Sequence, residues 1–258
     1  MSLEIDFTGP VYQDNYVYFL NDIHSKNTIV IDPPPEGHAQ KYLDQKNRRL
    51  VGILNTHHHP DHCGGISELK AKWNCPVWGP NESPISTLFD HYLSSGDTVG
   101  FFETPFSIQI LLGHASPLIS YYSLQHSALF CSDILFSLGC GRNFQGSLED
   151  LFESLQWIKT LPDDTLIFCS HEYTVQNGNF ALNVEPENEA LQKRHQQAKH
   201  MRDQGRPTIP STLAEEKLCN PFLRTDQESI RRRFFRDQWQ EVTDLEVFKK
   251  LRKKKDHF

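Results

Sequence analysis

The pattern of apolar and polar positions predicts short β-strands through the first two thirds of the chain. Two β-rich runs, 16–20 and 28–31, flank a polar turn, which is typical of a β-hairpin. Further apolar runs predict strands at 50–54, 76–78, 107–112, 128–131 and 165–169. Between them, Gly64-Gly65 lets the chain turn into a helix at 66–73. After Ser147, a candidate N-cap, apolar residues recur with helical spacing. Strands that alternate with helices indicate an α/β layered fold.

The composition changes after about residue 175, where the β-rich runs stop. Helices are expected at 188–204, 231–239 and 243–255, and after a capping box formed by Thr212 and Glu215. We therefore predict an α/β domain at 1–174 and a helical domain at 175–258.

The segment from Thr56 to His62, directly after the strand at 50–54, concentrates metal-capable side chains. Its candidate ligands are His57, His59, Asp61 and His62. Pro60 argues against a continuous helix. On an extended backbone, His57 and His59 project to one side, whereas the adjacent Asp61 and His62 project to different sides. Ligands that diverge in this way suit two neighbouring metal ions better than one; the alternative is a solvated, His-rich turn.

Three later strand ends each add one metal-capable residue. They are His114, Asp133 and His171. Ligand sites of α/β folds lie at the carboxyl ends of strands. A single His or Asp after a strand is more often a turn residue or a local cap than a ligand, so the prediction depends on their joint occurrence at successive strand ends. One ion could then be held by His57, His59 and His114 and the other by Asp61, His62 and His171, with Asp133 as the bridge.

This donor set predicts a hydrolase with a binuclear metal centre. Imidazole and carboxylate ligands suit zinc, which we expect, and also iron and manganese. Zinc lowers the pKa of bound water to about 7, so a metal-bound hydroxide would serve as nucleophile without a catalytic Ser or Cys. The alternative is a structural zinc site, but such sites are closed and usually rich in cysteine.

The composition narrows the classes of protein. The 258 residues are 38% hydrophobic and 23% charged, with a net charge of −7, which argues against general nucleic-acid binding. No apolar run is long enough for a membrane span, and residues 1–10 do not resemble a secretory signal. Because no signal is visible, we expect the six cysteines to be reduced thiols. They are scattered without a Cys-x-x-Cys pair, which argues against a zinc ribbon or a redox dithiol. We expect a cytoplasmic monomer that acts on a small molecule.

The segment 56–62 resembles the signature of the metallo-β-lactamase superfamily, and later stretches narrow the resemblance to the glyoxalase II, or hydroxyacylglutathione hydrolase, family. Those stretches are Gly113-His114, 132–136, Gly139-Cys140-Gly141-Arg142, 171–174, 220–224 and the basic C-terminal motif around Arg252 and Lys255. The resemblance covers essentially the whole chain. It implies a four-layer αβ/βα sandwich with a C-terminal helical subdomain, so that 1–174 would be the catalytic domain and 175–258 the substrate-binding domain. The implied reaction is hydrolysis of S-D-lactoylglutathione to D-lactate and glutathione, the second step of methylglyoxal detoxification.

The resemblance also implies roles for individual residues. The seven ligands named above match the family's metal ligands, with Asp61 and Asp133 as the catalytic carboxylates. Glutathione-binding positions fall on Arg142, Phe144, Tyr173, Arg252 and Lys255. Arg252 and Lys255 are three residues apart and so share a helix face. Without the resemblance, the basic run at 249–255 would favour a solvated helix end that complements the helix dipole.

The chain departs from the family pattern at four positions and leaves rival functions open. Ala115 and Leu118 stand where Thr and a second His are usual, Ser132 replaces a usual Gly, and Phe144 replaces a Tyr of some members. These departures concern hydrogen bonds around the ligands and the acyl preference. The rivals are a single-iron persulfide dioxygenase, a different thioesterase, a phosphodiesterase of the tRNA-processing type and a non-catalytic metal-binding protein.

Overall fold

The computed structural model describes residues 2–258, which form two compact units. Of the described residues, the first unit comprises 2–111 and 115–132, and the second comprises 112–114 and 133–258. The chain therefore passes between the units near two of the predicted ligands, His114 and Asp133. Each unit is described by itself below.

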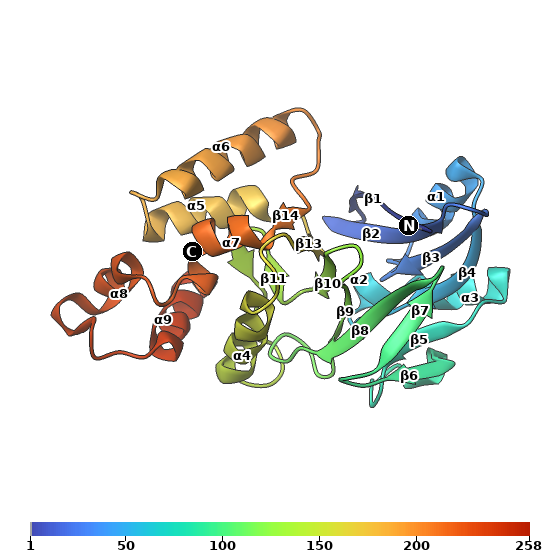
Figure 1. The fold of residues 1–258 in the computed structure, drawn as a ribbon, viewed down its shortest axis with the longest axis horizontal. Helices are drawn as coiled ribbons and strands as arrows, with labels where there is room; N and C mark the ends of the chain where they lie inside the picture. Colours follow the sequence, from blue (N-terminus) through green and yellow to red (C-terminus); the bar gives the residue numbers. More distant parts are fainter. Residues whose placement is uncertain (1) are drawn as a thin grey trace. The chain divides into compact units, whose positions relative to one another are not determined.

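The first unit contains a mixed sheet whose strands follow the chain order β1 to β6 (Figure 1). Its strands are β1 (Leu3–Val11), β2 (Asn15–Asp22), β3 (Asn27–Ile31), β4 (Arg49–Leu54), β5 (Val77–Pro80) and β6 (His91–Leu93). Strands β1, β2 and β3 are antiparallel, and β3 to β6 are parallel. The hairpin predicted from the two β-rich runs is confirmed as β2 and β3, and β4 confirms the strand that leads into the His-rich segment.

Helices cover one face of this sheet, and every second side chain of β2 points toward them. Helices of the unit are α1 (His38–Lys46), α2 (Pro60–Cys63) and α3 (Ile66–Trp73), with a 3-10 turn, η1, at Ser86–Leu88. Val17 and Phe19 of β2 pack in one apolar cluster with residues of α1 and α3. The Phe19 ring stacks on Tyr42 of α1 at 3.6 Å between ring centroids. The period of two along the strand thus sends every second side chain toward the helices.

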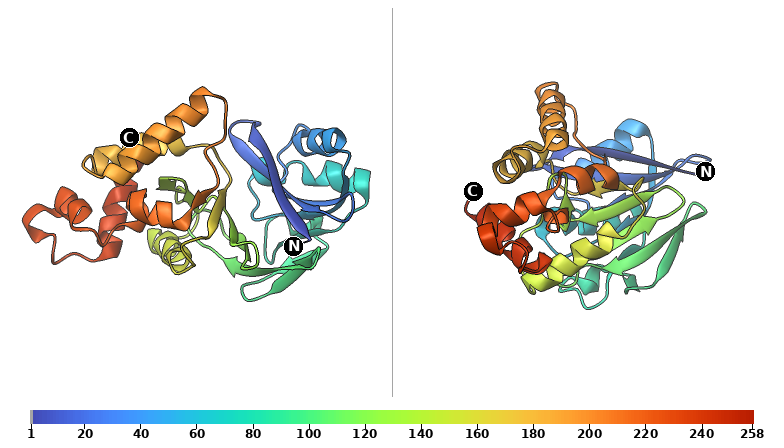
Figure 2. Two further views of the ribbon diagram at one scale, coloured as in Figure 1. Left: turned by 45° about the horizontal axis from the view of Figure 1, so that its top comes forward. Right: turned by 60° about the vertical axis from the view of Figure 1, so that its left-hand side comes forward.

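The other face of this sheet packs against an antiparallel meander. Its strands are β7 (Thr98–Phe101), β8 (Thr104–Ile110), β9 (Ile119–Ser123) and β10 (Ala128–Ser132). Tyr18 of β2 contacts Phe130 of β10 at 5.3 Å between ring centroids, and Trp78 of β5 contacts Phe101 of β7 at 5.1 Å. The unit is therefore layered as helices, sheet and sheet, and the turned views of Figure 2 show the same layers.

The second unit is mainly helical. Its strands are short: β11 (Leu135–Phe136) pairs with β12 (Gly139–Cys140), and β13 (Leu166–Cys169) pairs with β14 (Ser211–Thr212). Its helices are α4 (Leu148–Lys159), α5 (Thr174–Val184), α6 (Glu189–Asp203), α7 (Leu213–Cys219), α8 (Glu228–Phe235) and α9 (Asp244–Asp256), with 3-10 turns η2 (Pro221–Leu223) and η3 (Arg236–Gln238). Capping boxes open α4 at Ser147, α7 at Thr212 and α9 at Thr243. The N-cap expected at Ser147 and the capping box expected at Thr212 are confirmed.

Two expectations for this region are wrong in detail. The helix expected at 231–239 begins three residues earlier, at Glu228, and ends at Phe235. It ends because Arg236 adopts a positive φ of 49°, which interrupts the helical hydrogen-bond ladder. The region after residue 175 also contains a short strand, β14, although no β-rich run marks it; its two residues pair with β13.

The compact units do not follow the predicted domain limits. The second unit begins at Asp133, whereas the sequence places the domain limit between residues 174 and 175. That limit stays a prediction. Among residues 2–258, no helix combines the length and the apolar character that a bilayer span requires.

Candidate metal centre

Four of the predicted ligands lie in the first unit, on the segment that follows β4. His59 has an extended backbone (φ −64°, ψ 141°), and Pro60 then opens the four-residue helix α2 as its first residue. Proline suits that position because the first helical N–H needs no partner within the helix. The expectation that the side chains of Asp61 and His62 diverge is wrong, because both lie on this helical turn. His62 Nε2 and Asp61 Oδ2 are 3.0 Å apart.

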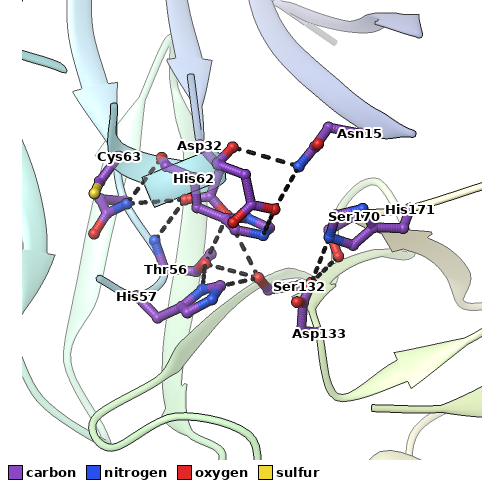
Figure 3. Close-up of polar contacts among 12 residues, drawn as sticks. Asn15, Asp32, Thr56, His57, His62, Cys63, Ser132, Asp133, Ser170 and His171 are labelled. Atoms are coloured by element: carbon purple, nitrogen blue, oxygen red, sulfur yellow. Dashed lines mark hydrogen bonds and ion pairs between the residues drawn. The ribbon is translucent and has the colours of Figure 1, made fainter. Parts of the chain in front are cut away.

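Asp32, which directly follows β3, organises this segment (Figure 3). Its carboxylate accepts hydrogen bonds from the Thr56 amide at 2.7 Å and the Thr56 hydroxyl at 2.6 Å. The same carboxylate lies 3.3 Å from His62 Nδ1. A carboxylate at Nδ1 keeps the proton on that nitrogen and presents Nε2 as the ligand atom. Asp32 therefore fixes both the backbone at Thr56 and the ring of His62.

A second polar side chain orients Asp61. The amide of Asn15, a buried residue at the start of β2, donates to Asp61 Oδ2 at 2.9 Å. His57 lies beside His59 and His62, with ring centroids 4.5 and 4.3 Å apart. The four predicted ligands of the first unit thus converge on one side of the segment.

The other three predicted ligands lie in the second unit and meet at one carboxylate. Asp133 Oδ2 is 3.1 Å from His114 Nε2, and Asp133 Oδ1 is 3.4 Å from His171 Nε2. The carboxylate therefore turns one oxygen toward each histidine. His114 Nδ1 donates to the carbonyl of Arg142 at 3.0 Å, which again leaves Nε2 as the ligand atom. Ser170 donates to Asp133 Oδ1 and holds the carboxylate in this orientation.

The backbone around Asp133 leaves no room for a side chain at Gly141. A Cβ atom at this position would lie 1.9 Å from the Asp133 carbonyl oxygen and 3.3 Å from His114 Nδ1. The Gly141 amide also donates to the Ile134 carbonyl at 3.0 Å. The glycine of the Cys-Gly-Arg stretch therefore allows the chain to pass directly beside two ligands.

The donor sets of both units fit divalent metal ions. Two donors bound to one ion at about 2.1 Å lie roughly 3.0–3.4 Å apart at the angles of tetrahedral or octahedral coordination. The separations of 3.0 Å in the first unit and of 3.1 and 3.4 Å in the second lie in that range. The donors are imidazole nitrogens and carboxylate oxygens, which first-row divalent ions accept. The Cys63 thiol, whose pKa burial raises to about 11, donates to the His58 carbonyl at 3.4 Å.

All five predicted glutathione-binding residues lie in the second unit. The Tyr173 ring stacks on the ligand candidate His171 at 5.0 Å, with an angle of 7° between the rings. Phe144 is 62% exposed and its ring lies 5.3 Å from that of His114. Arg142 is exposed and Lys255 is half-buried. Four of the five residues are therefore accessible, and two of them contact predicted ligands.

Arg252 differs from the other four because it is almost completely buried, with 2% exposure. Its guanidinium donates to the carbonyls of Cys140 at 3.0 Å and Gly141 at 3.3 Å, and pairs with Asp256 at 2.9 Å. It also lies over the Phe222 ring, 5.3 Å from the centroid. The contacts with the two carbonyls hold the backbone of the Cys-Gly-Arg stretch in place.

The departures from the family pattern fall in two kinds of surroundings. Ala115 and Leu118 are fully buried, so apolar packing occupies the positions where Thr and His are usual. Ser132 is also buried, but it adds a hydroxyl to the Asp32–Thr56 hydrogen bonds. The sequence reasoning missed Asp32, Asn15 and Ser170. The strand-end pattern that found His114 could have found Asp32, which directly follows β3.

Comparison with known proteins identifies the family. Residues 10–171 match the family model of the metallo-beta-lactamase superfamily, and residues 172–258 match the model described as hydroxyacylglutathione hydrolase C-terminus. A hydroxyacylglutathione hydrolase of Photobacterium profundum is 42% identical over 250 residues, which cover 96% of this chain and 97% of the relative. One from Rhodopseudomonas palustris is 43% identical over 222 residues, covering 86% of this chain and 87% of the relative. The chain belongs to the hydroxyacylglutathione hydrolase family. The resemblance inferred from the motifs is confirmed, and the family is one of metal-dependent hydrolases.

Solved structures confirm the fold. The structure of ETHE1 from Myxococcus xanthus matches with a TM-score of 0.67 and 21% identity, covering 97% of this chain and 90% of that chain. A metallo-beta-lactamase from Staphylococcus aureus matches with a TM-score of 0.66 and 18% identity, covering 97% of this chain and 70% of that chain. The fold class, a metallo-β-lactamase fold with a C-terminal helical region, is therefore confirmed. At these identities the likeness concerns the fold alone.

Proposed function

We propose that this hydroxyacylglutathione hydrolase family member cleaves the thioester of S-D-lactoylglutathione to D-lactate and glutathione, as the second step of methylglyoxal detoxification. The observation that carries the proposal is the Asp133 carboxylate, which turns separate oxygens toward His114 and His171. A carboxylate in this arrangement suits a bridge between two ions. The relatives named hydroxyacylglutathione hydrolase, which align over almost the whole chain, support the substrate class.

The proposed ligand sets follow the expectation from the sequence. One ion would be held by His57, His59 and His114, the other would be held by Asp61, His62 and His171, and Asp133 would serve both. Two divalent ions, zinc in our proposal, supply an activated water and a Lewis acid for the thioester carbonyl when bound. Asp32 and the Arg142 carbonyl keep the Nδ1 protons of His62 and His114 in place. The glutathione thiolate needs no obligatory proton donor, because a free thiol has a pKa of about 8.5.

The glutathione moiety carries two carboxylates, for which the second unit offers cations. We propose that Arg142 and Lys255 bind them, that Phe144 and Tyr173 line the same site, and that Arg252 supports it. Burial is the main cause that lowers the pKa of Lys255 to about 8, and the nearby Arg252 and Arg142 lower it further. A desolvated cation forms a stronger ion pair with a carboxylate than a fully hydrated one. We also propose that the protein acts as a monomer in the cytoplasm, where its six free cysteines remain reduced.

The substrate assignment is tested by comparing two lactoyl thioesters. S-D-lactoylglutathione carries the two glutathione carboxylates, whereas the lactoyl thioester of N-acetylcysteamine carries neither. We expect kcat/KM to be at least about 100-fold higher for the glutathione thioester, since two charge-assisted contacts contribute about 1.5 kcal/mol or more each. Equal kcat/KM values would indicate a general thioesterase, and turnover of neither would favour another superfamily activity such as persulfide oxidation.

The role of Lys255 predicts a pH dependence of KM. As the pH rises through about 8, Lys255 loses its charge, so KM for S-D-lactoylglutathione is expected to rise. The Lys255→Arg variant keeps its charge and should not show this rise. The amino group of the substrate titrates equally in both assays, so the ratio of the two KM values between pH 7 and 9.5 isolates the lysine. A ratio that stays constant would exclude Lys255 as the cationic contact.

The same shift has a consequence for stability. The folded-state pKa of Lys255 lies below its ordinary value of 10.5, so the unfolded chain binds more protons between about pH 8 and 10.5. Burial of this lysine therefore costs stability at neutral pH, and the cost falls as the pH rises through that window.

A further inference from the structure

Ser132 combines an uncommon backbone conformation with a buried hydroxyl. It is the last residue of β10 and has a φ of +50°, in the left-handed region that non-glycine residues rarely adopt. Glycine would adopt this conformation without a steric penalty. The side chain is only 4% exposed, so the hydroxyl is shielded from water. This backbone conformation is less favourable for serine than for glycine. The hydroxyl is the feature of serine that glycine lacks.

The Ser132 hydroxyl joins the hydrogen bonds that surround His57 (Figure 3). Ser132 Oγ lies 2.8 Å from Thr56 Oγ1, 3.4 Å from His57 Nδ1 and 3.5 Å from Asp32 Oδ2. Thr56 Oγ1 lies 3.0 Å from the same His57 nitrogen. Two hydroxyl oxygens, of Thr56 and Ser132, therefore face His57 Nδ1 together, and all four residues belong to the first unit.

Counting protons assigns the direction of these hydrogen bonds. The Thr56 hydroxyl carries one proton and gives it to the charged Asp32 carboxylate, the shortest contact at 2.6 Å. The Ser132 hydroxyl in turn donates its proton to the same carboxylate oxygen, Asp32 Oδ2, at 3.5 Å. Both hydroxyl oxygens retain lone pairs toward His57 Nδ1, so that nitrogen carries the ring proton. His57 Nε2 is thereby left as the nitrogen that can bind a metal.

We propose that Ser132 is a positioning residue, which together with Thr56 fixes the tautomer and ring orientation of His57 and so tightens metal binding at the ion that His57 serves. The inference rests on the proposed function in one respect, the assignment of His57 as a ligand. A hydrogen-bonding partner behind a metal ligand typically changes metal affinity by about 10–100-fold. Thr56 also contacts His57 Nδ1, so removal of the Ser132 hydroxyl alone is expected to weaken metal binding by about 10-fold.

The test uses the full-length protein and substitutions that separate the hydroxyl from the backbone. Ser132→Gly removes the hydroxyl and relieves the left-handed backbone, so the apo protein should melt at the same or a higher temperature. The dissociation constant for one of two zinc ions, measured by competition with a chromophoric chelator, should nevertheless rise about 10-fold. Ser132→Ala should weaken zinc binding equally while retaining the backbone penalty. A purely structural role would move melting temperature and zinc affinity in the same direction.

Ser127→Gly is the matched control. Ser127 also has a left-handed backbone, with a φ of 45°, and lies in the turn between β9 and β10. Its replacement should affect melting temperature as Ser132→Gly does and leave both zinc affinities unchanged. Unaltered zinc affinity in Ser132→Gly and Ser132→Ala would overturn the proposal.

A second readout keeps the proposal separate from the proposed function. In protein with 15N-labelled histidine, the ring nitrogens of His57 should report a single Nδ1-protonated tautomer in the native apo protein. A mixture of tautomers is expected in Ser132→Gly. If the native protein bound no metal, the proposed function would fail, but the tautomer of His57 would still test the role of Ser132. The same tautomer in the native protein and in Ser132→Gly would overturn that role.

Discussion

Replacing Asp133 with alanine is expected to lower kcat/KM for S-D-lactoylglutathione by at least about 1,000-fold, or about 4 kcal/mol of transition-state stabilisation. The two oxygens of this carboxylate face two histidines of different strand ends. Alanine removes both oxygens, so in the proposed centre each ion would lose one ligand and the spacing between the ions would no longer be set. Metal content, measured by mass spectrometry after gel filtration, should fall together with activity.

Two further variants make this prediction specific. Asp133→Asn keeps the shape of the side chain and the Ser170 contact, but its amide has only one oxygen to offer and should also lose most of the activity. Asp203→Ala, at the exposed end of α6, is the matched control and should retain full activity and metal content. Normal turnover by Asp133→Ala would contradict the scheme with two ions.

Replacing Arg252 with alanine is expected to destabilise the protein by about 3 kcal/mol. The substitution leaves the buried carbonyls of Cys140 and Gly141 without their donor, which costs about 1–3 kcal/mol, and removes the packing on Phe222. The melting temperature should fall by about 6–12 °C. Because Gly141 lies directly beside Asp133 and His114, loosening this stretch should also lower kcat.

The pattern of effects distinguishes two roles for Arg252. A residue that only binds glutathione would raise KM on substitution and leave the melting temperature unchanged. Lys253→Ala is the matched control, since Lys253 is the exposed neighbour on the same helix and should change neither quantity. An Arg252→Ala protein with native stability and a raised KM would show that the buried contacts are unimportant and that the arginine serves the substrate alone.

The sequence predicted the strands and the ligand-bearing strand ends because their patterns are local. Strand β4 lies where an apolar run predicted it, and helix α3 follows Gly64-Gly65 as expected. The capping signals at Ser147 and Thr212 depend on residues three positions apart, so they too can be read from the sequence alone. The candidate metal ligands formed a recognisable set because they lie after four strands, in one cluster and three single positions.

Features that depend on contacts distant in the sequence could not be predicted in the same way. Asn15 meets Asp61 across 46 positions, and no local pattern marks that pair. The burial of Arg252 has a partial signal: it continues the buried stripe of Phe248 and Leu251 along α9, although the surrounding lysines suggest a solvated helix. The end of α8 at Arg236 has no signal in the sequence, because no glycine or proline marks the positive φ.

The most direct test of the central claim is hydrolysis of S-D-lactoylglutathione by the purified protein, measured before and after removal of metal with a chelator. The account predicts rapid turnover that is lost on chelation and restored by about two equivalents of zinc per chain, or of iron or manganese. Turnover that survives complete removal of metal would contradict the metal centre. Full metal content without turnover of this thioester would contradict the proposed substrate.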